Sequence, residues 1–121
     1  MVQTKTTTMI TIYHNNRCGK SRTALSILQE KNIKFEVLEY LKDIPTVEEL
    51  TTIIKKLKIK PHDLIRTKEP VYIEKYKGKT LTDAQWIEAM HENPILIERP
   101  IVINGNKAVV ARPPQRVLEI L

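Results

Sequence analysis

The pattern that most constrains the fold is a strand, a loop, a helix and a second strand within residues 9–40. Residues 9–13 have the β-branched content of a strand, and residues 34–40 read as another. Between them, apolar residues recur at helical spacing from Ser21 to about Asn32. Two strands joined through a helix run parallel, because a parallel pair needs a crossover connection. The chain is therefore expected to be an α/β protein.

The last third of the chain predicts an antiparallel hairpin. Two β-branched runs, residues 100–103 and 107–110, flank an Asn-Gly turn at Asn104 and Gly105. Two prolines then suit the first turn of a short closing helix. We expect this helix to contain Val117, Leu118 and Leu121.

The middle of the chain reads as mainly helical. Thr46 with Glu49 and Thr82 with Gln85 match capping boxes, which predict helices from Val47 to Leu57 and from Asp83 to Glu92. The second helix should pack through Ala84, Trp86, Ile87 and Met90. Residues 61–65 read as a short helical turn and 67–79 mostly as loop. The resulting order, β-α-β-α-α-β-β-α, predicts a mixed sheet with helices packed on it.

Length and composition fit one soluble domain. The chain has 121 residues, 41% hydrophobic and 28% charged, enough for a single core but not for two. We expect residues 1–8 to be a flexible lead-in and 9–121 to form the domain. The start lacks the apolar core of a secretory signal, and no stretch reaches the roughly 18 apolar residues of a membrane span. A cytoplasmic location follows, because a free thiol suits a reducing compartment.

The chain has one cysteine, Cys18, so no intramolecular disulfide can form. Cys18 falls at the junction of the polar loop and the first predicted helix. The free amides and the positive dipole end of a helix N-terminus stabilise a thiolate. The nearby cations Arg17, Lys20 and Arg22 should add to this effect. We therefore interpret Cys18 as a reactive nucleophile rather than a buried packing residue.

The residues around Cys18 favour anion binding. Gly19 would let a substrate approach closely, and the amides of the Cys18-Gly19-Lys20-Ser21 run could cradle an anion. Ser21 stands where a dithiol oxidoreductase would have its second cysteine, so an oxidised Cys18 would need an external thiol. Ser21 could equally serve as a helix cap. His14 could polarise the thiol or orient a neighbour, or be an ordinary residue at a strand end.

Four segments resemble the glutaredoxin-dependent arsenate reductase family, the ArsC-like proteins with a thioredoxin-like fold. These segments are residues 12–22, 64–68, 91–103 and 111–114, and the resemblance covers Met9 to Leu121. It implies a thioredoxin-like, mixed four-stranded sheet flanked by helices, with a helical insertion.

The resemblance also implies a reaction and a set of residues. Cys18 matches the nucleophile that attacks arsenate, and the thiol-arsenate adduct is reduced by glutathione, after which glutaredoxin resolves the mixed disulfide. His14 matches a secondary catalytic histidine, and Pro100 a cis-proline opposite the thiol. The matches to the family's oxyanion-binding arginines are Arg66, Arg99 and Arg112. Arginine's multi-donor fork suits a tetrahedral oxyanion, and Arg99 and Arg112 should share one rim because they bracket the predicted hairpin.

Two features depart from the family pattern. Asn16-Arg17 stands where family members commonly have a proline ahead of the nucleophile, and Lys20 often corresponds to threonine. Both changes keep the loop polar and make it more basic. They bear on substrate choice rather than on thiolate formation.

The sequence also bears on other functions. A thiol oxidoreductase with another substrate stays open. A regulator similar to Spx, which binds RNA polymerase, is disfavoured by Ser21 in place of a second cysteine. The net charge of +6 alone does not make a nucleic-acid module, because there is no stacking motif. His14, His62 and His91 lack metal-ligand spacing. We expect a monomer with no metal and no bound cofactor, using glutathione as co-substrate.

Overall fold

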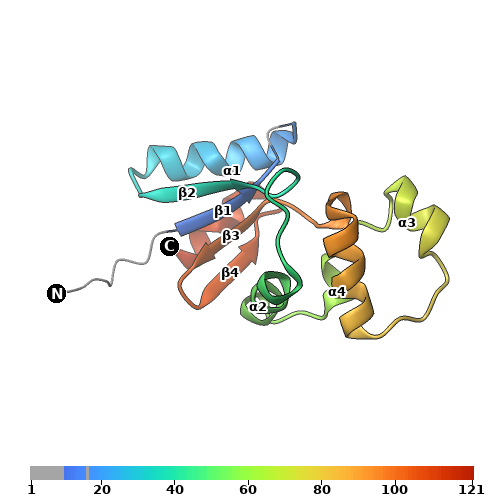
Figure 1. Cartoon of the computed structure of the whole chain (residues 1–121). Coiled ribbons are helices and arrows are strands. Elements are labelled where there is room, and N and C mark those ends of the chain that lie inside the picture. Colours follow the sequence, from blue (N-terminus) through green and yellow to red (C-terminus); the bar gives the residue numbers. More distant parts are fainter. Residues whose placement is uncertain (1–9, 16) are drawn as a thin grey trace. The chain divides into compact units, whose positions relative to one another are not determined.

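The computed structural model describes residues 10–15 and 17–121 (Figure 1). The expected lead-in, residues 1–8, lies outside this described part. The chain divides into two compact units. One, called the sheet unit below, comprises the chain up to Glu39 together with Arg99–Leu121, and the other, the insertion, is Tyr40–Glu98. The predicted helical insertion into an α/β domain is therefore present.

The sheet unit holds a four-stranded mixed sheet in the order β2-β1-β3-β4. Strand β1 (Ile10–His14) pairs in parallel with β2 (Phe35–Glu39), with α1 (Gly19–Glu30) as the crossover. It pairs on its other side, antiparallel, with β3 (Ile101–Asn104). The hairpin of β3 and β4 (Lys107–Val110) completes the sheet. The predicted βαβ unit and hairpin are both confirmed.

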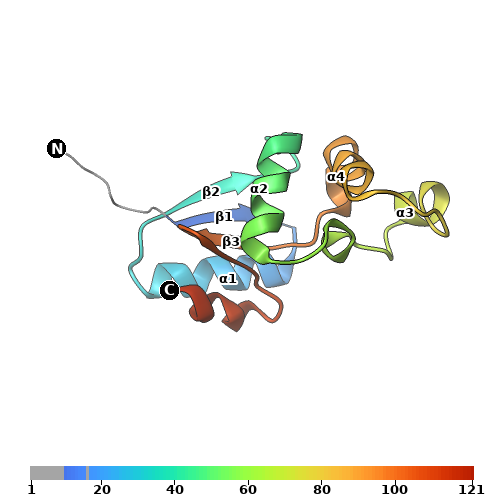
Figure 2. The same ribbon diagram turned by 90° about the horizontal axis from the view of Figure 1, so that it is seen from below.

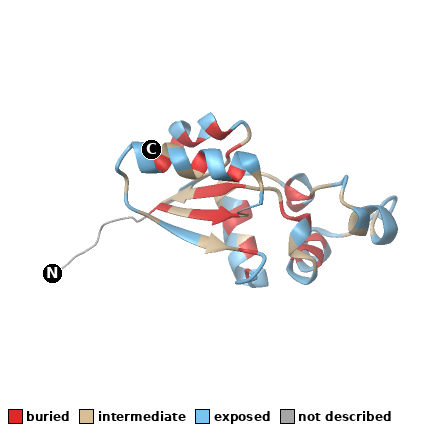
Figure 3. Cartoon of the chain, turned by 90° about the horizontal axis from the view of Figure 1, so that it is seen from above, coloured by how far each residue is buried: buried red, intermediate tan, exposed pale blue. Residues whose placement is uncertain are grey.

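One side of the sheet is covered by α1 and by the closing 3₁₀ helix η4 (Pro114–Ile120), which lie next to each other in Figure 2. The two central strands are largely buried, whereas the edge strand β2 is partly exposed (Figure 3). Apolar side chains from both layers form the core of this unit: Ile10, Ile12, Ala24, Leu28, Val102, Val109, Ala111, Val117 and Ile120.

Local signals explain the end of the sheet unit. Gly105 has φ 62°, a conformation that glycine adopts without strain, and it directly follows the last residue of β3. The closing helix buries Val117 and Ile120, whereas Leu118 and Leu121 are exposed. The prediction of a closing helix is confirmed, although Leu121 lies just past its last residue. Asn104 holds this helix, because its Nδ2 donates to the carbonyl of Ile120 at 2.6 Å.

The insertion is built from helices and 3₁₀ turns. Its elements are α2 (Val47–Leu57), η2 (Pro61–Leu64), α3 (Pro70–Lys75), α4 (Asp83–Glu92) and η3 (Pro94–Leu96). Both predicted capping boxes are present, at Thr46 with Glu49 and at Thr82 with Gln85. These caps satisfy amides that the helices leave open at their N-termini, which accounts for the accurate predicted starts of α2 and α4.

The insertion departs from expectation at two points, although residues 67–79 lie mostly outside helices as predicted. Residues 67–79 contain the helix α3, and the reason is aromatic packing: Tyr72 of α3 stacks on Trp86 of α4, with ring centroids 6.1 Å apart. That contact joins residues distant in sequence, which a local pattern does not reveal. In α4, Ala84 is exposed and Ala89 takes its place in the buried stripe.

None of the helices within residues 10–15 and 17–121 is long and apolar enough to cross a membrane.

Candidate active site

The loop before α1 is organised by Asn15. Its carbonyl accepts from the amide of Cys18 at 3.0 Å, and its side-chain Oδ1 accepts from the amide of Arg17 at 3.0 Å. Its own amide donates to Oγ of Ser21 at 3.1 Å. Asn15 thereby makes the compact turn that its residue type favours. The turn delivers Cys18 to the N-cap position of α1.

Ser21 and His14 form a buried pair behind this loop. Nδ1 of His14 lies 2.6 Å from Oγ of Ser21, and the two residues are 5% and 0% exposed. Ser21 is therefore not the helix cap that the sequence left open, because α1 begins at Gly19 and Cys18 occupies the cap. The Ser21 hydroxyl is engaged inside the protein, so its backbone amide is the group that this residue offers at the site. The side-chain contact of His14 in the described structure is thus with Ser21, and a role in orienting a neighbour stays a prediction.

The environment of Cys18 lowers the pKa of its thiol. Partial burial opposes this by raising the pKa, and it is the largest single effect. Hydrogen bonds from the amides of Ser21 and Lys20, together with the charge and hydrogen bond of the Arg99 guanidinium, outweigh it. The predicted thiolate stabilisation at the helix start thus has a structural basis. The contribution of Lys20 comes from its amide rather than from its side-chain charge.

The pKa of His14 is lowered as well. Burial is the main cause, and the charge of Arg22 adds to it, whereas the carboxylate of Glu39 opposes both. A neutral imidazole suits the contact with Ser21, because an unprotonated Nδ1 can accept a hydrogen bond from the hydroxyl.

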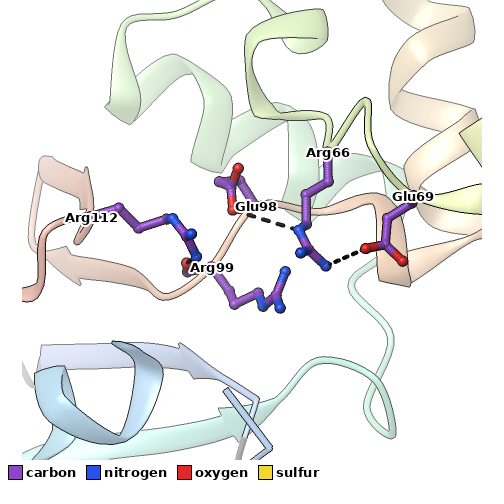
Figure 4. A network of polar contacts seen from close by, with 5 residues as sticks. All are labelled: Arg66, Glu69, Glu98, Arg99 and Arg112. Carbon is purple, nitrogen blue, oxygen red and sulfur yellow. Dashed lines mark hydrogen bonds and ion pairs between the residues drawn. The ribbon is translucent and has the colours of Figure 1, made fainter. Parts of the chain in front are cut away.

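Arg99 and Arg112 lie together at the open end of the hairpin. Nη1 of Arg112 donates to the carbonyl of Arg99 at 3.2 Å (Figure 4), and the amide of Ala111 donates to the carbonyl of Pro100 at 2.9 Å. The expectation that the two arginines share one rim is confirmed. The Arg99–Pro100 peptide bond is cis, the geometry that the resemblance implies. Arg112 thus supports the backbone at Arg99, whose guanidinium reaches Cys18.

Arg66 belongs to the insertion and follows η2. Its Nη1 lies 2.7 Å from Oε2 of Glu69, and its Nε lies 3.8 Å from Oε1 of Glu98 (Figure 4). The amide of Arg66 donates to the carbonyl of Leu96 at 2.8 Å. Arg66 is therefore a partly buried, ion-paired side chain rather than a solvated surface cation.

Nothing in the described packing requires a glycine at position 19. A Cβ added to Gly19 would meet only the Arg22 side chain, at 3.7 Å, an ordinary contact distance. The close approach of a substrate at Gly19 stays a prediction.

Positive charge gathers in the sheet unit. The described residues of that unit include nine Lys and Arg against four Asp and Glu, whereas the insertion has ten of each and is neutral. The unit with the thiol thus favours anionic ligands. Among the residues that the structure describes, no three His, Cys, Asp or Glu side chains cluster in a way that could hold a metal ion.

Three supporting residues were missed by the sequence reasoning. Asn15 could have been found from its place in a polar loop, because asparagine favours such turns. Glu98 directly precedes Arg99 in the motif, but nothing in the sequence indicates that its side chain contacts Arg66. Glu69 had no signal, because its role depends on the contact with Arg66.

The sheet unit combines a mixed four-stranded sheet, one cysteine at the N-cap of α1 and a cis-proline after an arginine. These features define a thioredoxin-like protein with a single cysteine. Comparison with known proteins then names the family. A family model described as the ArsC family matches residues 13–120, so the chain belongs to the ArsC family.

Individual relatives are similar over nearly their whole length. An arsenate reductase of Haemophilus influenzae is 44% identical over 114 residues, covering 93% of this chain and 98% of its own. The uncharacterized protein YfgD of Escherichia coli is 40% identical over 117 residues, covering 95% and 98%. A solved structure titled arsenate reductase from Vibrio cholerae has a TM-score of 0.91 at 41% identity, covering 94% of this chain and 98% of that one.

Proposed function

We propose that the protein reduces arsenate to arsenite through the thiolate of Cys18. The observation that carries the proposal is the environment of Cys18, where the Ser21 amide and the Arg99 guanidinium lower the pKa of the thiol. The same donors suit the oxygens of a bound oxyanion. The names of the relatives, several of them arsenate reductases, support arsenate as the oxyanion.

The proposed reaction balances with one external thiol. The Cys18 thiolate attacks arsenic(V) and displaces one oxygen as water, forming a thiol-arsenate adduct. Glutathione then supplies the second thiol. Two electrons pass from the two sulfurs to arsenic, which leaves as arsenite, and the sulfurs remain joined as a Cys18–glutathione disulfide. Glutaredoxin takes the glutathionyl group and returns the Cys18 thiol.

An external thiol is required because the chain has one cysteine. Ser21, at the place of a resolving cysteine, has its hydroxyl buried on His14 and Asn15. We therefore propose glutathione as co-substrate, glutaredoxin as partner, and no bound cofactor. Such a cycle needs a reducing compartment, which favours the cytoplasm, and the protein would act as a monomer.

Each arginine has a proposed part in this scheme. Arg99 holds the thiolate and the oxyanion, Arg112 supports Arg99 through its carbonyl and supplies further positive charge, and Arg66 is a third anion ligand. The role of Arg66 is proposed from the family resemblance. Its described ion-pair partners are the carboxylates of Glu69 and Glu98.

A coupled assay tests the function. Purified protein is mixed with glutathione, glutaredoxin, glutathione reductase and NADPH, and NADPH oxidation is followed with and without arsenate. We expect arsenate-dependent oxidation that Cys18→Ser abolishes. If oxidation is independent of arsenate while Cys18 still alkylates rapidly at neutral pH, arsenate is the wrong substrate and a thiol oxidoreductase acting on another substrate replaces the proposal.

A further inference from the structure

The guanidinium of Arg66 carries two carboxylate partners. Glu69 approaches Nη1 to 2.7 Å and Glu98 approaches Nε to 3.8 Å, and the three side chains are only 17–28% exposed (Figure 4). Partly buried ion pairs are screened by salt less than exposed ones. The Glu69 carboxylate brings a negative charge to within 2.7 Å of the guanidinium nitrogen. That charge opposes the approach of another anion.

The backbone holds Arg66 and Glu98 side by side. Ile65 and Ile97 form an antiparallel bridge. The Arg66 amide donates to the Leu96 carbonyl and the Glu98 amide to the Leu64 carbonyl, each at 2.8 Å. The bridge residues are buried, and the bridge places Glu98 beside the guanidinium.

Glu69 is held differently. It is the N-cap residue of α3, yet its carboxylate makes no cap there and reaches back to Arg66 instead. Its amide donates to the Arg66 carbonyl at 3.2 Å. The turn from Arg66 to Glu69 is thus closed by a backbone bond and by an ion pair. Breaking the ion pair leaves the backbone bond in place, so the carboxylate can leave Arg66 without unfolding the turn.

We propose that Glu69 is a specificity-determining residue whose carboxylate competes with the oxyanion for Arg66. The inference rests on the proposed function, in which Arg66 is an anion ligand. A tetrahedral dianion offers two charges and several acceptor oxygens, so it can replace the carboxylate on the guanidinium fork. A monoanion offers too little charge to replace it. Glu98 stays beside Nε and keeps the guanidinium oriented.

Sulfate and nitrate serve as the dianionic and monoanionic probes. Their dissociation constants are measured at constant ionic strength by NMR titration, following backbone amide signals, which every variant retains. Glu69→Gln removes the charge and keeps the side-chain size. We expect it to tighten sulfate binding about five- to tenfold, since the loss of an ion pair worth about 1 kcal/mol corresponds to a factor of this size. The sulfate-over-nitrate preference should shrink.

Matched variants separate competition from a general charge effect. Glu74→Gln removes the same charge from an exposed position of α3 and should leave both constants unchanged. In an Arg66→Ala background, Glu69→Gln should have no effect, because its target is gone. Glu69→Ala should tighten sulfate binding as Glu69→Gln does. Agreement between the two variants would show that the effect does not come from a folding defect in one of them.

Unchanged or weaker sulfate binding in Glu69→Gln would overturn the proposal, as would an equal effect without Arg66. These results are distinct from failure of the proposed function. If the wild type does not reduce arsenate but Glu69→Gln tightens sulfate binding through Arg66, the specificity role stands alone. If arsenate is reduced and sulfate binding does not change, the specificity role fails.

Discussion

His14 and Ser21 form a buried side-chain pair, with Nδ1 of His14 2.6 Å from Oγ of Ser21. The same hydroxyl accepts the amide of Asn15. The pair therefore fixes the start of α1 at the point where the Ser21 amide meets Cys18. Removing the hydroxyl should disturb both stability and thiol reactivity.

Ser21→Ala tests this role. The variant leaves the Asn15 amide and the His14 nitrogen without their partner, at a cost of about 1–3 kcal/mol. We expect the free energy of unfolding in urea to fall by that amount and Cys18 to alkylate more slowly at pH 7. Ser26→Ala is the control, because Ser26 lies on the same helix, is exposed and bonds only the Arg22 carbonyl among the contacts described. It should change stability by less than about 0.5 kcal/mol. Equal effects in both variants would contradict the role of the pair.

The lowered pKa of His14 predicts a pH dependence of stability. Folding depresses this pKa, so near the ordinary histidine value of about 6.5 the unfolded chain binds more protons than the folded one. Stability from the neutral His14 is then fully present above that value and is lost as the pH falls through and below it. Urea unfolding between about pH 5 and 8 should show a smaller loss on acidification in His14→Gln than in the wild type. Parallel curves for the two proteins would show that His14 is not the group responsible.

The pKa of Cys18 depends on Arg99. Arg99→Ala removes both a positive charge and a hydrogen bond from the thiolate, so this pKa should rise toward the ordinary thiol value. The rate of iodoacetamide alkylation at pH 7 should then fall about three- to tenfold. Arg116→Ala is the control, since Arg116 is exposed and pairs with Glu119. An alkylation profile that is the same in Arg99→Ala and the wild type would remove Arg99 from the activation of Cys18.

Gly19→Ala separates folding from substrate approach. The added methyl group meets only the Arg22 side chain at 3.7 Å, and alanine favours a helix over glycine by up to about 1 kcal/mol. The variant should therefore be as stable as the wild type or slightly more so. If Gly19 gives room to an oxyanion, the KM for arsenate should rise severalfold in the coupled assay. An unchanged KM would mean that Gly19 has no part in substrate approach.

Elements that depend on local signals were predictable from the sequence. The helix starts at Thr46 and Thr82 follow capping boxes, and the hairpin follows Gly105 and its β-branched flanks. Helix α3 was not predictable, because its Tyr72 depends on stacking with Trp86 in another helix. The first helix was expected to start at Ser21, because its apolar spacing begins there, whereas it starts at Gly19.

The residues of the site also divide into those that local signals predict and those that depend on long-range contacts. Cys18 at a helix start and the neighbouring pair Arg99 and Arg112 could be inferred from order along the chain. The partners of Arg66 could not, because Glu98 reaches it through a bridge between segments about thirty residues apart. The division of charge was equally hidden, since it depends on which segments fold into which unit.

The mass of the intact protein after a reaction without glutaredoxin tests most directly whether Cys18 reduces arsenate. The protein is incubated with glutathione and arsenate, or with glutathione alone, and analysed intact by mass spectrometry while released arsenite is quantified. We expect one glutathione per chain on Cys18, formed only with arsenate and matched by one arsenite. A Cys18 that stays unmodified with arsenate, or that gains glutathione equally without it, would show that this thiol does not reduce arsenate by the proposed route.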